Sequence, residues 1–201
     1  MNRKVGILGG TFDPIHMGHL ILAQQAFEQF QLDRVLIMPG GNPPHKKNAG
    51  GADAADRAQM VRLAIEGNPA FELSEEDLHT EGYSYTRLLL RRMKEMSPDT
   101  DFFFIMGADS LMAFDTWNGP EEICSLCTLA VAVRDSMDTA ELEEQIERAE
   151  KRYSADIRLL STPNIDIASH VIRQRVKEGR SIRYYVPDSV RTYIQSQGLY
   201  T

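Results

Sequence analysis

The chain has 201 residues, of which 42% are hydrophobic and 25% are charged, a composition typical of an ordinary globular protein. Its 22 Lys and Arg residues against 29 Asp and Glu residues give a formal net charge of −7, which argues against a general nucleic-acid binder. Two cysteines cannot make a disulfide scaffold, and the apolar runs are strand-sized, well short of the ~18–20 residues that span a bilayer. We therefore expect a cytoplasmic protein.

Short β-rich runs alternate with longer amphipathic stretches. In chain order the pattern predicts a strand at 5–8, a helix at 19–30, a strand at 35–38, a helix at 56–66, a weak strand at 71–78, a helix at 85–96, a strand at 101–106, a short helix from Pro120, a strand at 128–133, a helix at 139–153, a strand at 157–160, and helices at 168–177 and 187–197. This alternation predicts an α/β fold with a doubly wound parallel sheet of about five or six strands, in which the first strand is central. Because no linker interrupts the pattern, we expect one domain over residues 1–201, with a small helical part from about 165 to 201.

The densest motif is Gly9-Gly10-Thr11-Phe12-Asp13-Pro14-Ile15-His16-Met17-Gly18-His19, which follows the first strand and opens the first helix. Ligands of parallel sheets bind beyond the carboxyl ends of the strands, and a helix N-terminus there attracts anions. Gly9 and Gly10 would let a ligand approach the backbone, and Gly18 would leave space for something flat or bulky. His16 and His19, three residues apart, are expected to face the same side. The motif therefore predicts a site for phosphates.

Other interpretations of these residues stay open. The glycines and histidines could merely form a turn and cap a helix. A zinc site at His16 and His19 would need two more ligands, and the only cysteine pair is Cys124 and Cys127. That pair is better explained by packing at the end of the short helix than by a Cys-x-x-Cys redox site, which would begin a helix after a strand. The spacing of the glycines is neither the dinucleotide-binding fingerprint nor a P-loop.

The His16-x-Gly18-His19 motif resembles the signature of the nucleotidyltransferase superfamily, and the chain as a whole is similar to bacterial nicotinate-nucleotide adenylyltransferases. Further matches follow in the order of that family: Asn42-Pro43-Pro44-His45-Lys46, Tyr85-Thr86, Gly107-Ala108-Asp109-Ser110, Trp117, and Ile167-Ala168-Ser169-His170-Val171-Ile172-Arg173. The resemblance implies a Rossmann-like fold and an enzyme of NAD biosynthesis. Such an enzyme transfers the adenylyl group of ATP to nicotinate mononucleotide, giving deamido-NAD and pyrophosphate.

The resemblance also implies roles for particular residues. The catalytic residues would be His16, His19, Lys46 and Arg173. The residues that contact ATP would be Gly9, Gly10, Thr11, Phe12, Gly107, Asp109, Ile167 and Ser169. The residues that contact nicotinate mononucleotide would be Thr86 and Trp117. Mg²⁺ would arrive with ATP, held mainly by phosphates and water, and no metal site is expected in the protein itself.

Simpler explanations exist for several of these residues. Lys46 could be a solvated loop lysine, and Trp117, the only tryptophan, could be a core anchor. Thr86 also suits a helix start. Asp109 and Ser110 could also cap the following helix. Both roles could hold, with one of the two residues capping the helix and the other binding ribose.

The segment before Arg173 departs from the usual family pattern Ile-Ser-Ser-Thr-x-Ile-Arg. Ala168 stands in place of the first serine and His170 in place of the threonine, so two hydroxyls are missing. Ser169 and Arg173, four residues apart, should share a helix face, and an arginine can bind two phosphate oxygens. The other basic residues nearby are expected to form a solvated surface, not a nucleic-acid site.

Three other functions fit parts of the sequence. One is another small-substrate nucleotidyltransferase, acting on nicotinamide mononucleotide or phosphopantetheine. Another is a non-catalytic nucleotide-binding protein of the same fold, and a third is a tRNA-binding module, for which the chain is short and acidic. We expect ATP and nicotinate mononucleotide as partners, with no nucleic acid and no membrane, and a homo-oligomer is compatible with the sequence. We also expect both histidines to face a wet site outside the core.

Overall fold

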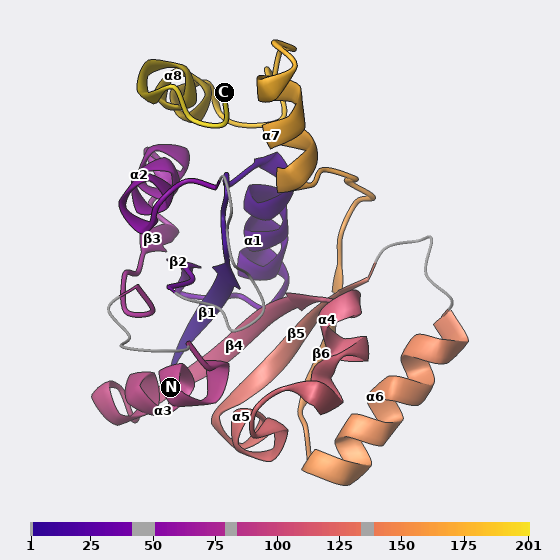
Figure 1. Ribbon diagram of the computed structural model, residues 1–201. Coiled ribbons are helices and arrows are strands. Elements are labelled where there is room, and N and C mark those ends of the chain that lie inside the picture. The colour runs from indigo at the N-terminus through magenta and orange to yellow at the C-terminus, as the bar shows by residue number, and fades with distance from the viewer. Residues whose placement is uncertain (1, 42–50, 79–83, 134–138) are drawn as a thin grey trace. The chain divides into compact units, whose positions relative to one another are not determined.

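The computed structural model describes residues 2–41, 51–78, 84–133 and 139–201 (Figure 1). These residues form two compact units. Unit 1 comprises Met1–Gly9, Leu22–Leu36 and Tyr85–Asn164, and unit 2 comprises Gly10–Ile21, Ile37–Ser84 and Ile165–Thr201. None of the helices in the described ranges is long and apolar enough to cross a membrane.

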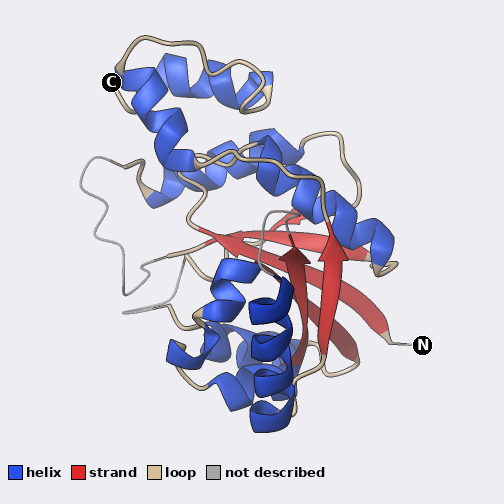
Figure 2. Cartoon of the chain, turned by 90° about the vertical axis from the view of Figure 1, so that its right-hand side faces the viewer, coloured by secondary structure: helices blue, strands red, loops and turns tan. Residues whose placement is uncertain are grey.

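Strands and helices alternate along most of the chain; Figure 2 shows the strands in red and the helices in blue. The strands are β1 (Arg3–Gly10), β2 (Arg34–Pro39), β3 (Phe71–Leu73), β4 (Thr100–Gly107), β5 (Cys127–Val133) and β6 (Ile157–Ser161). The helices are α1 (Met17–Gln29), α2 (Ala54–Ile65), α3 (Thr86–Met96), α4 (Ala108–Met112), α5 (Pro120–Leu126), α6 (Thr139–Tyr153), α7 (Ser169–Lys177) and α8 (Asp188–Gln197), with a short 3-10 helix at Phe114–Thr116.

The six strands form one sheet in the order β3-β2-β1-β4-β5-β6. In unit 1, β1 pairs with β4, β4 with β5, and β5 with β6, all in parallel. The predicted parallel α/β sheet, its strand number and the central position of the first strand are confirmed. From β1 the chain adds β2 and β3 on one side of the sheet, and it then adds β4, β5 and β6 on the other side. This strand order is the doubly wound, Rossmann-like arrangement.

The core of unit 1 explains why its strands are apolar throughout. All five residues of β4 from Phe102 to Met106 are buried, and Leu129, Ala130 and Val131 of β5 are wholly inaccessible to solvent. Helices α4 and α5 contact these strands, and α6 contacts α4 and α5 (Figure 1). A parallel strand covered on both faces has no polar side, so alternation gives way to a continuous apolar run.

Unit 2 is held largely by helix α2. This helix contacts α8 and β3 (Figure 1). The Ser189 hydroxyl of α8 donates to the carbonyl of Leu63 at 2.9 Å. Asp53 caps α2, accepting a hydrogen bond from the backbone N–H of Asp56 at 2.8 Å. The buried residues of α2 are Arg57, Ala58, Met60, Val61 and Ile65.

Some predicted details are wrong. The third strand is the three-residue β3, not 71–78, because the backbone turns where Leu78 donates to the carbonyl of Glu75. Helix α1 begins at Met17, two residues before the predicted start. Helix α4, which sequence reasoning missed, begins at Ala108 with Gly107 as its N-cap, so Asp109 lies inside the first turn and is not a cap.

Candidate functional site

His16 and His19 are stacked on each other in unit 2. Their ring centroids lie 3.6 Å apart with an angle of 20° between the ring planes. His16 precedes the first residue of α1, and its carbonyl accepts the backbone N–H of His19 at 3.0 Å, so the first helical turn brings the rings together. The expectation that both histidines face the same side is confirmed. Phe12 packs against His19 in a T-shaped arrangement: the ring centroids lie 4.9 Å apart, and the angle between the ring planes is 85°.

The two histidines differ in their protonation chemistry. Nδ1 of His19 accepts a hydrogen bond from the backbone N–H of His16 at 3.2 Å, so the neutral ring carries its proton on Nε2. His16 is buried with 5% exposure, and burial lowers its pKa to about 4. The ring of His16 is therefore neutral at physiological pH. The expectation that both histidines lie outside the core is wrong for His16, which is buried with its ring against Gly18 and the ring of His19.

The glycines of the motif make room for side chains of the protein itself. A Cβ on Gly18 would lie 3.1 Å from Nδ1 of His16, so the flat group for which Gly18 leaves space is the ring of His16. A Cβ on Gly10 would lie 2.8 Å from the ring of Phe12. Gly9, by contrast, has only ordinary contacts at 3.9 Å and ends β1 together with Gly10.

Arg57 of α2 holds the turn after β1, and sequence reasoning did not identify it. Its guanidinium donates from Nη1 to the carbonyl of Thr11 at 2.7 Å and to that of Gly40 at 2.8 Å, and Nη2 lies 3.4 Å from the carbonyl of Gly41. Arg57 is 3% exposed; burial lowers its pKa, while the charge of Asp13 raises it. The signal was an arginine on the apolar stripe of a predicted helix, three and four residues before Met60 and Val61.

Asp13 is the second buried charge that shapes this turn. Its Oδ1 accepts hydrogen bonds from the backbone N–H of Ala52 at 3.0 Å and from the Tyr200 hydroxyl at 2.7 Å. Burial and the bond to Asp13 raise the pKa of Tyr200, so its hydroxyl stays a donor. Oδ2 of Asp13 lies 3.6 Å from Nη1 of Arg173. One carboxylate thus joins the motif to three distant segments of unit 2.

Ser169 and Arg173 share a face of α7, as predicted, and that face contacts the motif. The Ser169 hydroxyl donates to the carbonyl of Pro14 at 2.9 Å, and Nη1 of Arg173 donates to the carbonyl of Asp13 at 2.7 Å. The Arg173 side chain is 34% exposed, so it is not fully buried by these contacts. Ala168 is the N-cap of α7 and supplies no side-chain cap, so the first missing hydroxyl falls at a capping position. Ile167 lies just before the cap and is half-buried.

In unit 1, the residues predicted to contact ATP are exposed. Gly107 ends β4, and Asp109 lies in the first turn of α4 at the carboxyl end of that strand. Both are exposed, whereas their neighbours Ala108 and Leu111 are buried. Because the buried neighbours anchor α4 to the sheet, the Asp109 carboxylate is left on the solvent side.

Trp117 and Thr86 also belong to unit 1. Trp117 follows the 3-10 helix and is half-buried; its ring lies 5.5 Å from that of Phe114 and 6.0 Å, edge to face, from that of Phe104. It is therefore not the fully buried core anchor of the simpler explanation. Thr86 is the first residue of α3 and is half-buried, so its position at a helix start is confirmed.

The cysteine pair lies at the end of a helix, as predicted. Cys124 is in α5 and Cys127 begins β5, both are buried, and the Cys127 thiol lies 3.3 Å from the carbonyl of Ile123. Burial raises the pKa of Cys124 to about 11 and that of Cys127 still further. Protonated, buried thiols are poor nucleophiles, which disfavours a redox role.

Metal ligands do not gather in the described ranges. Within residues 2–41, 51–78, 84–133 and 139–201, no three His, Cys, Asp or Glu side chains form a group that could hold a metal ion. Lys46 and the Asn42–His45 segment lie outside the described residues.

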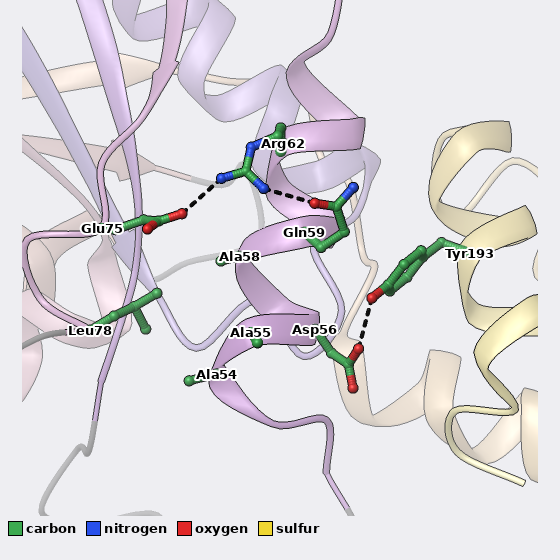
Figure 3. A pocket seen from close by; sticks show the side chains of 9 residues that line it. All are labelled: Ala54, Ala55, Asp56, Ala58, Gln59, Arg62, Glu75, Leu78 and Tyr193. Atoms are coloured by element: carbon green, nitrogen blue, oxygen red, sulfur yellow. Dashed lines mark hydrogen bonds and ion pairs between the residues drawn. The ribbon is translucent and has the colours of Figure 1, made fainter.

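A separate pocket of about 730 Å³ lies in unit 2 along α2 (Figure 3). Its charged side chains have partners within the pocket: Arg62 donates to Glu75 at 2.9 Å, and Asp56 accepts a hydrogen bond from the Tyr193 hydroxyl at 2.8 Å (Figure 3). None of the predicted site residues lines it. We assign no function to this pocket.

Comparison with known proteins places these features in one family. Residues 7–175 match the family described as cytidylyltransferase-like. A relative from Lachnoclostridium phytofermentans, named "probable nicotinate-nucleotide adenylyltransferase", is 40% identical over 98% of this chain and 99% of its own length. A relative of the same name from Clostridium novyi is 41% identical over 98% of this chain and 99% of its own length.

Solved structures show the same fold. The Plasmodium falciparum nicotinic acid mononucleotide adenylyltransferase complexed with APC superposes with a TM-score of 0.77 at 19% identity, covering 98% of this chain and 97% of that one. Its complex with NaAD gives a TM-score of 0.78. The chain belongs to the cytidylyltransferase-like family, whose Rossmann-like fold it has.

The depressed pKa of His16 predicts a pH-dependent loss of stability. As the pH falls below 6.5, the ring takes up a proton in the unfolded chain but stays neutral in the folded chain until about pH 4. Falling pH therefore favours the unfolded state. When the pH is lowered from 7.5 to 5, the free energy of unfolding should fall in both proteins, and the fall should be about 2 kcal/mol larger in the wild type than in His16→Asn.

Urea unfolding at the two pH values measures this difference. The matched control is His170→Asn, since His170 is exposed to solvent at the start of α7. It should keep the pH dependence of the wild type. An unchanged pH dependence in His16→Asn would contradict the assignment of a buried neutral ring.

Proposed function

We propose that this chain is a nicotinate-nucleotide adenylyltransferase, which transfers the adenylyl group of ATP to nicotinate mononucleotide and releases pyrophosphate. The observation that carries the proposal is the stacked His16–His19 pair at the start of α1, in a chain that matches relatives of that name over 98% of its length. The reaction makes deamido-NAD, which places the enzyme in NAD biosynthesis.

The chemistry asks the protein for position and charge. A phosphate oxygen of the mononucleotide attacks the α-phosphorus of ATP, the bond to the β-phosphate breaks, and pyrophosphate leaves. Since both nucleophile and leaving group belong to the substrates, the enzyme need not supply a nucleophile. Its task is to align two polyanions and to stabilise the charge that develops on the transferred phosphate.

His19 is suited to that task by its tautomer. With Nδ1 engaged by the backbone of His16, the neutral ring offers Nε2–H as a donor to a phosphate oxygen. His16, neutral and buried, supports the ring of His19 from one side through stacking. A donor held in place before the substrate arrives costs little reorganisation during the transfer.

Cations would complete the phosphate contacts. Arg173 has a partly exposed side chain in the same unit as the histidines, where it already contacts Asp13. We assign it to the phosphates of ATP, with Lys46 as the second cation. Gly10, Thr11, Phe12, Ile167 and Ser169 belong to the same ATP-binding set, in which Thr11 has its carbonyl held by Arg57.

Unit 1 would recognise the remaining parts of the substrates. Gly9, Gly107 and Asp109 are assigned to ATP, and the exposed Asp109 carboxylate suits hydrogen bonds from ribose hydroxyls. Trp117 would stack on the pyridine ring, and Thr86, at the N-terminus of α3, would meet its carboxylate. We propose that both units serve this one reaction as a single adenylyltransferase domain.

Mg²⁺ fits this reaction as a companion of ATP. The described residues provide no cage of carboxylates, so the ion would be held mainly by phosphate oxygens and water. Bound in that way, it would neutralise charge on the phosphates. The predicted cytoplasmic location stays a prediction.

The alternative functions make different demands. A non-catalytic nucleotide-binding protein would have no need of a stacked histidine pair in which one ring is buried. A phosphopantetheine adenylyltransferase would have no pyridine ring for the half-buried Trp117. Discrimination between nicotinate and nicotinamide would depend on groups that meet the carboxylate of the ring.

A panel of acceptors tests the reaction. We expect pyrophosphate release from ATP with nicotinate mononucleotide at a rate well above that with nicotinamide mononucleotide, because the N-terminus of α3 favours a carboxylate over a neutral amide. Phosphopantetheine should give no product. Equal rates with the two mononucleotides, or product only with phosphopantetheine, would show that the assigned substrate is wrong.

Replacing His19 tests the phosphate donor. His19→Ala should lower turnover by roughly 10²–10³-fold, the loss typical of one preorganised donor, while the melting temperature changes little. His170→Ala should turn over like the wild type. Tightly bound zinc that disappears in His19→Ala would instead support a metal site, and a folded His19→Ala enzyme with normal turnover would remove this histidine from the mechanism.

Replacing Arg173 separates a site cation from surface charge. Arg173→Ala should lower kcat/KM for ATP by the equivalent of about 1.5–3 kcal/mol, the contribution of a charge-assisted hydrogen bond. Lys177→Ala, on the same helix but exposed, should leave kcat/KM for ATP unchanged. Steady-state kinetics with varied ATP compares the two variants. Similar behaviour of both would mean that the arginine belongs to a solvated surface.

A further inference from the structure

Arg87 connects two segments of unit 1 that are far apart in the sequence. It is the second residue of α3, directly after Thr86. Its Nε donates a hydrogen bond to the side-chain oxygen of Asn118, directly after Trp117, and its Nη1 donates to Glu122 of α5 at 3.2 Å. The start of α3 and the turn before α5 are therefore joined by one side chain.

The turn that receives this contact is shaped around it. Gly119 has φ 69°, in the left-handed region that favours glycine, and a Cβ there would lie 2.6 Å from Cδ of Arg87. The carbonyl of Gly119 accepts the backbone N–H of Glu122 at 3.1 Å and so begins α5. The Arg87 side chain thus packs against the backbone of the turn as well as bonding to Asn118.

Trp117 depends on this turn for its position. Its backbone N–H donates to the carbonyl of Phe114 at 2.9 Å, and its ring contacts Phe114 and Phe104. On the other side of Trp117 along the chain, Asn118 is exposed and is held by Arg87. Contacts within unit 1 therefore hold the chain on both sides of the Trp117 ring, which reduces the ordering that binding of a ligand would require.

We propose that Arg87 is a positioning residue for the acceptor, which fixes the Trp117–Gly119 turn to the start of α3 so that Trp117 and Thr86 are preorganised for a pyridine ring and its carboxylate. This inference rests on the proposed function for the identity of the acceptor. The Arg87 side chain is 29% exposed, and it donates hydrogen bonds to Asn118 and Glu122. Arg87 would therefore affect binding of the acceptor indirectly, by fixing the position of the Trp117–Gly119 turn.

Arg91 provides a matched control on the same helix. It lies one turn further along α3 and donates from Nε to the same Glu122 at 2.6 Å. Arg91→Ala removes a similar charge and a contact to the same carboxylate, but it leaves the bond between Arg87 and Asn118 in place.

Kinetics provide the first readout. Arg87→Ala should raise KM for nicotinate mononucleotide roughly tenfold, because one charge-assisted contact no longer holds the turn before binding. KM for ATP and kcat should change little. Asn118→Ala should reproduce the effect, and the double variant Arg87→Ala/Asn118→Ala should be no worse than either single variant. Arg87→Lys should recover part of the affinity, and Arg91→Ala should behave like the wild type.

Fluorescence provides a readout that needs no substrate. Trp117 is the only tryptophan of the chain, so emission excited at a wavelength that tyrosine does not absorb reports on this turn alone. In the free enzyme, Arg87→Ala and Asn118→Ala should increase quenching of Trp117 by acrylamide, and Arg91→Ala should not. Thermal unfolding of each variant shows whether the fold itself has changed.

The outcomes separate this proposal from the proposed function. Unchanged KM and quenching in Arg87→Ala would overturn the positioning role while the adenylyl transfer stands. A raised KM in Arg87→Ala with normal quenching and a normal Asn118→Ala enzyme would also overturn it, since Arg87 would then touch the substrate itself. A wild-type enzyme that does not use nicotinate mononucleotide would overturn the proposed function, and the quenching comparison would still decide whether Arg87 fixes the turn.

Discussion

The turn that carries the histidine motif in unit 2 depends on the hydrogen bonds made by the buried guanidinium of Arg57. It binds the carbonyls of Thr11 and Gly40, which lie where the chain leaves β1 and β2, and it does so at 3% exposure. Backbone carbonyls at strand ends have lost their sheet partners and would be costly to bury alone. A fixed fork of donors satisfies them from one side chain, whereas a lysine has only a point charge. The nearby carboxylate of Asp13 balances the charge.

Contacts within the protein also fix the two histidines: they orient the ring of His19 and bury the ring of His16. The backbone N–H of His16 occupies Nδ1 of His19, and Gly18 makes room for the ring of His16. Burial then keeps His16 neutral. In the proposed reaction, a His19 ring whose orientation is already fixed needs no rotation when a phosphate binds. Unit 1 applies the same principle with Arg87 and the turn that carries Trp117.

Short chemical motifs could be found from the sequence because their residues are neighbours in the chain. The strand and helix order followed from apolar runs in β4 and β5, which have no polar side once both faces are covered. The same-face placement of His16 with His19, and of Ser169 with Arg173, followed from helix geometry alone. The boundaries were harder to predict: β3 ends where the chain turns and Leu78 donates to the carbonyl of Glu75, and α4 begins directly after β4 with Gly107 as its N-cap.

The sequence by itself therefore determined the class of the fold, the central first strand and the identity of the family, because each depends on local periodicity or on a contiguous motif. Only the tertiary structure decided that Arg57 is buried against backbone carbonyls, that Asp13 joins Ala52, Tyr200 and Arg173, and that Arg87 holds the turn after Trp117. These contacts join residues separated by more than thirty positions in most cases, and no local pattern specifies which distant partner a charged side chain will meet. The burial that gives such charges their effect exists only once the chain has folded.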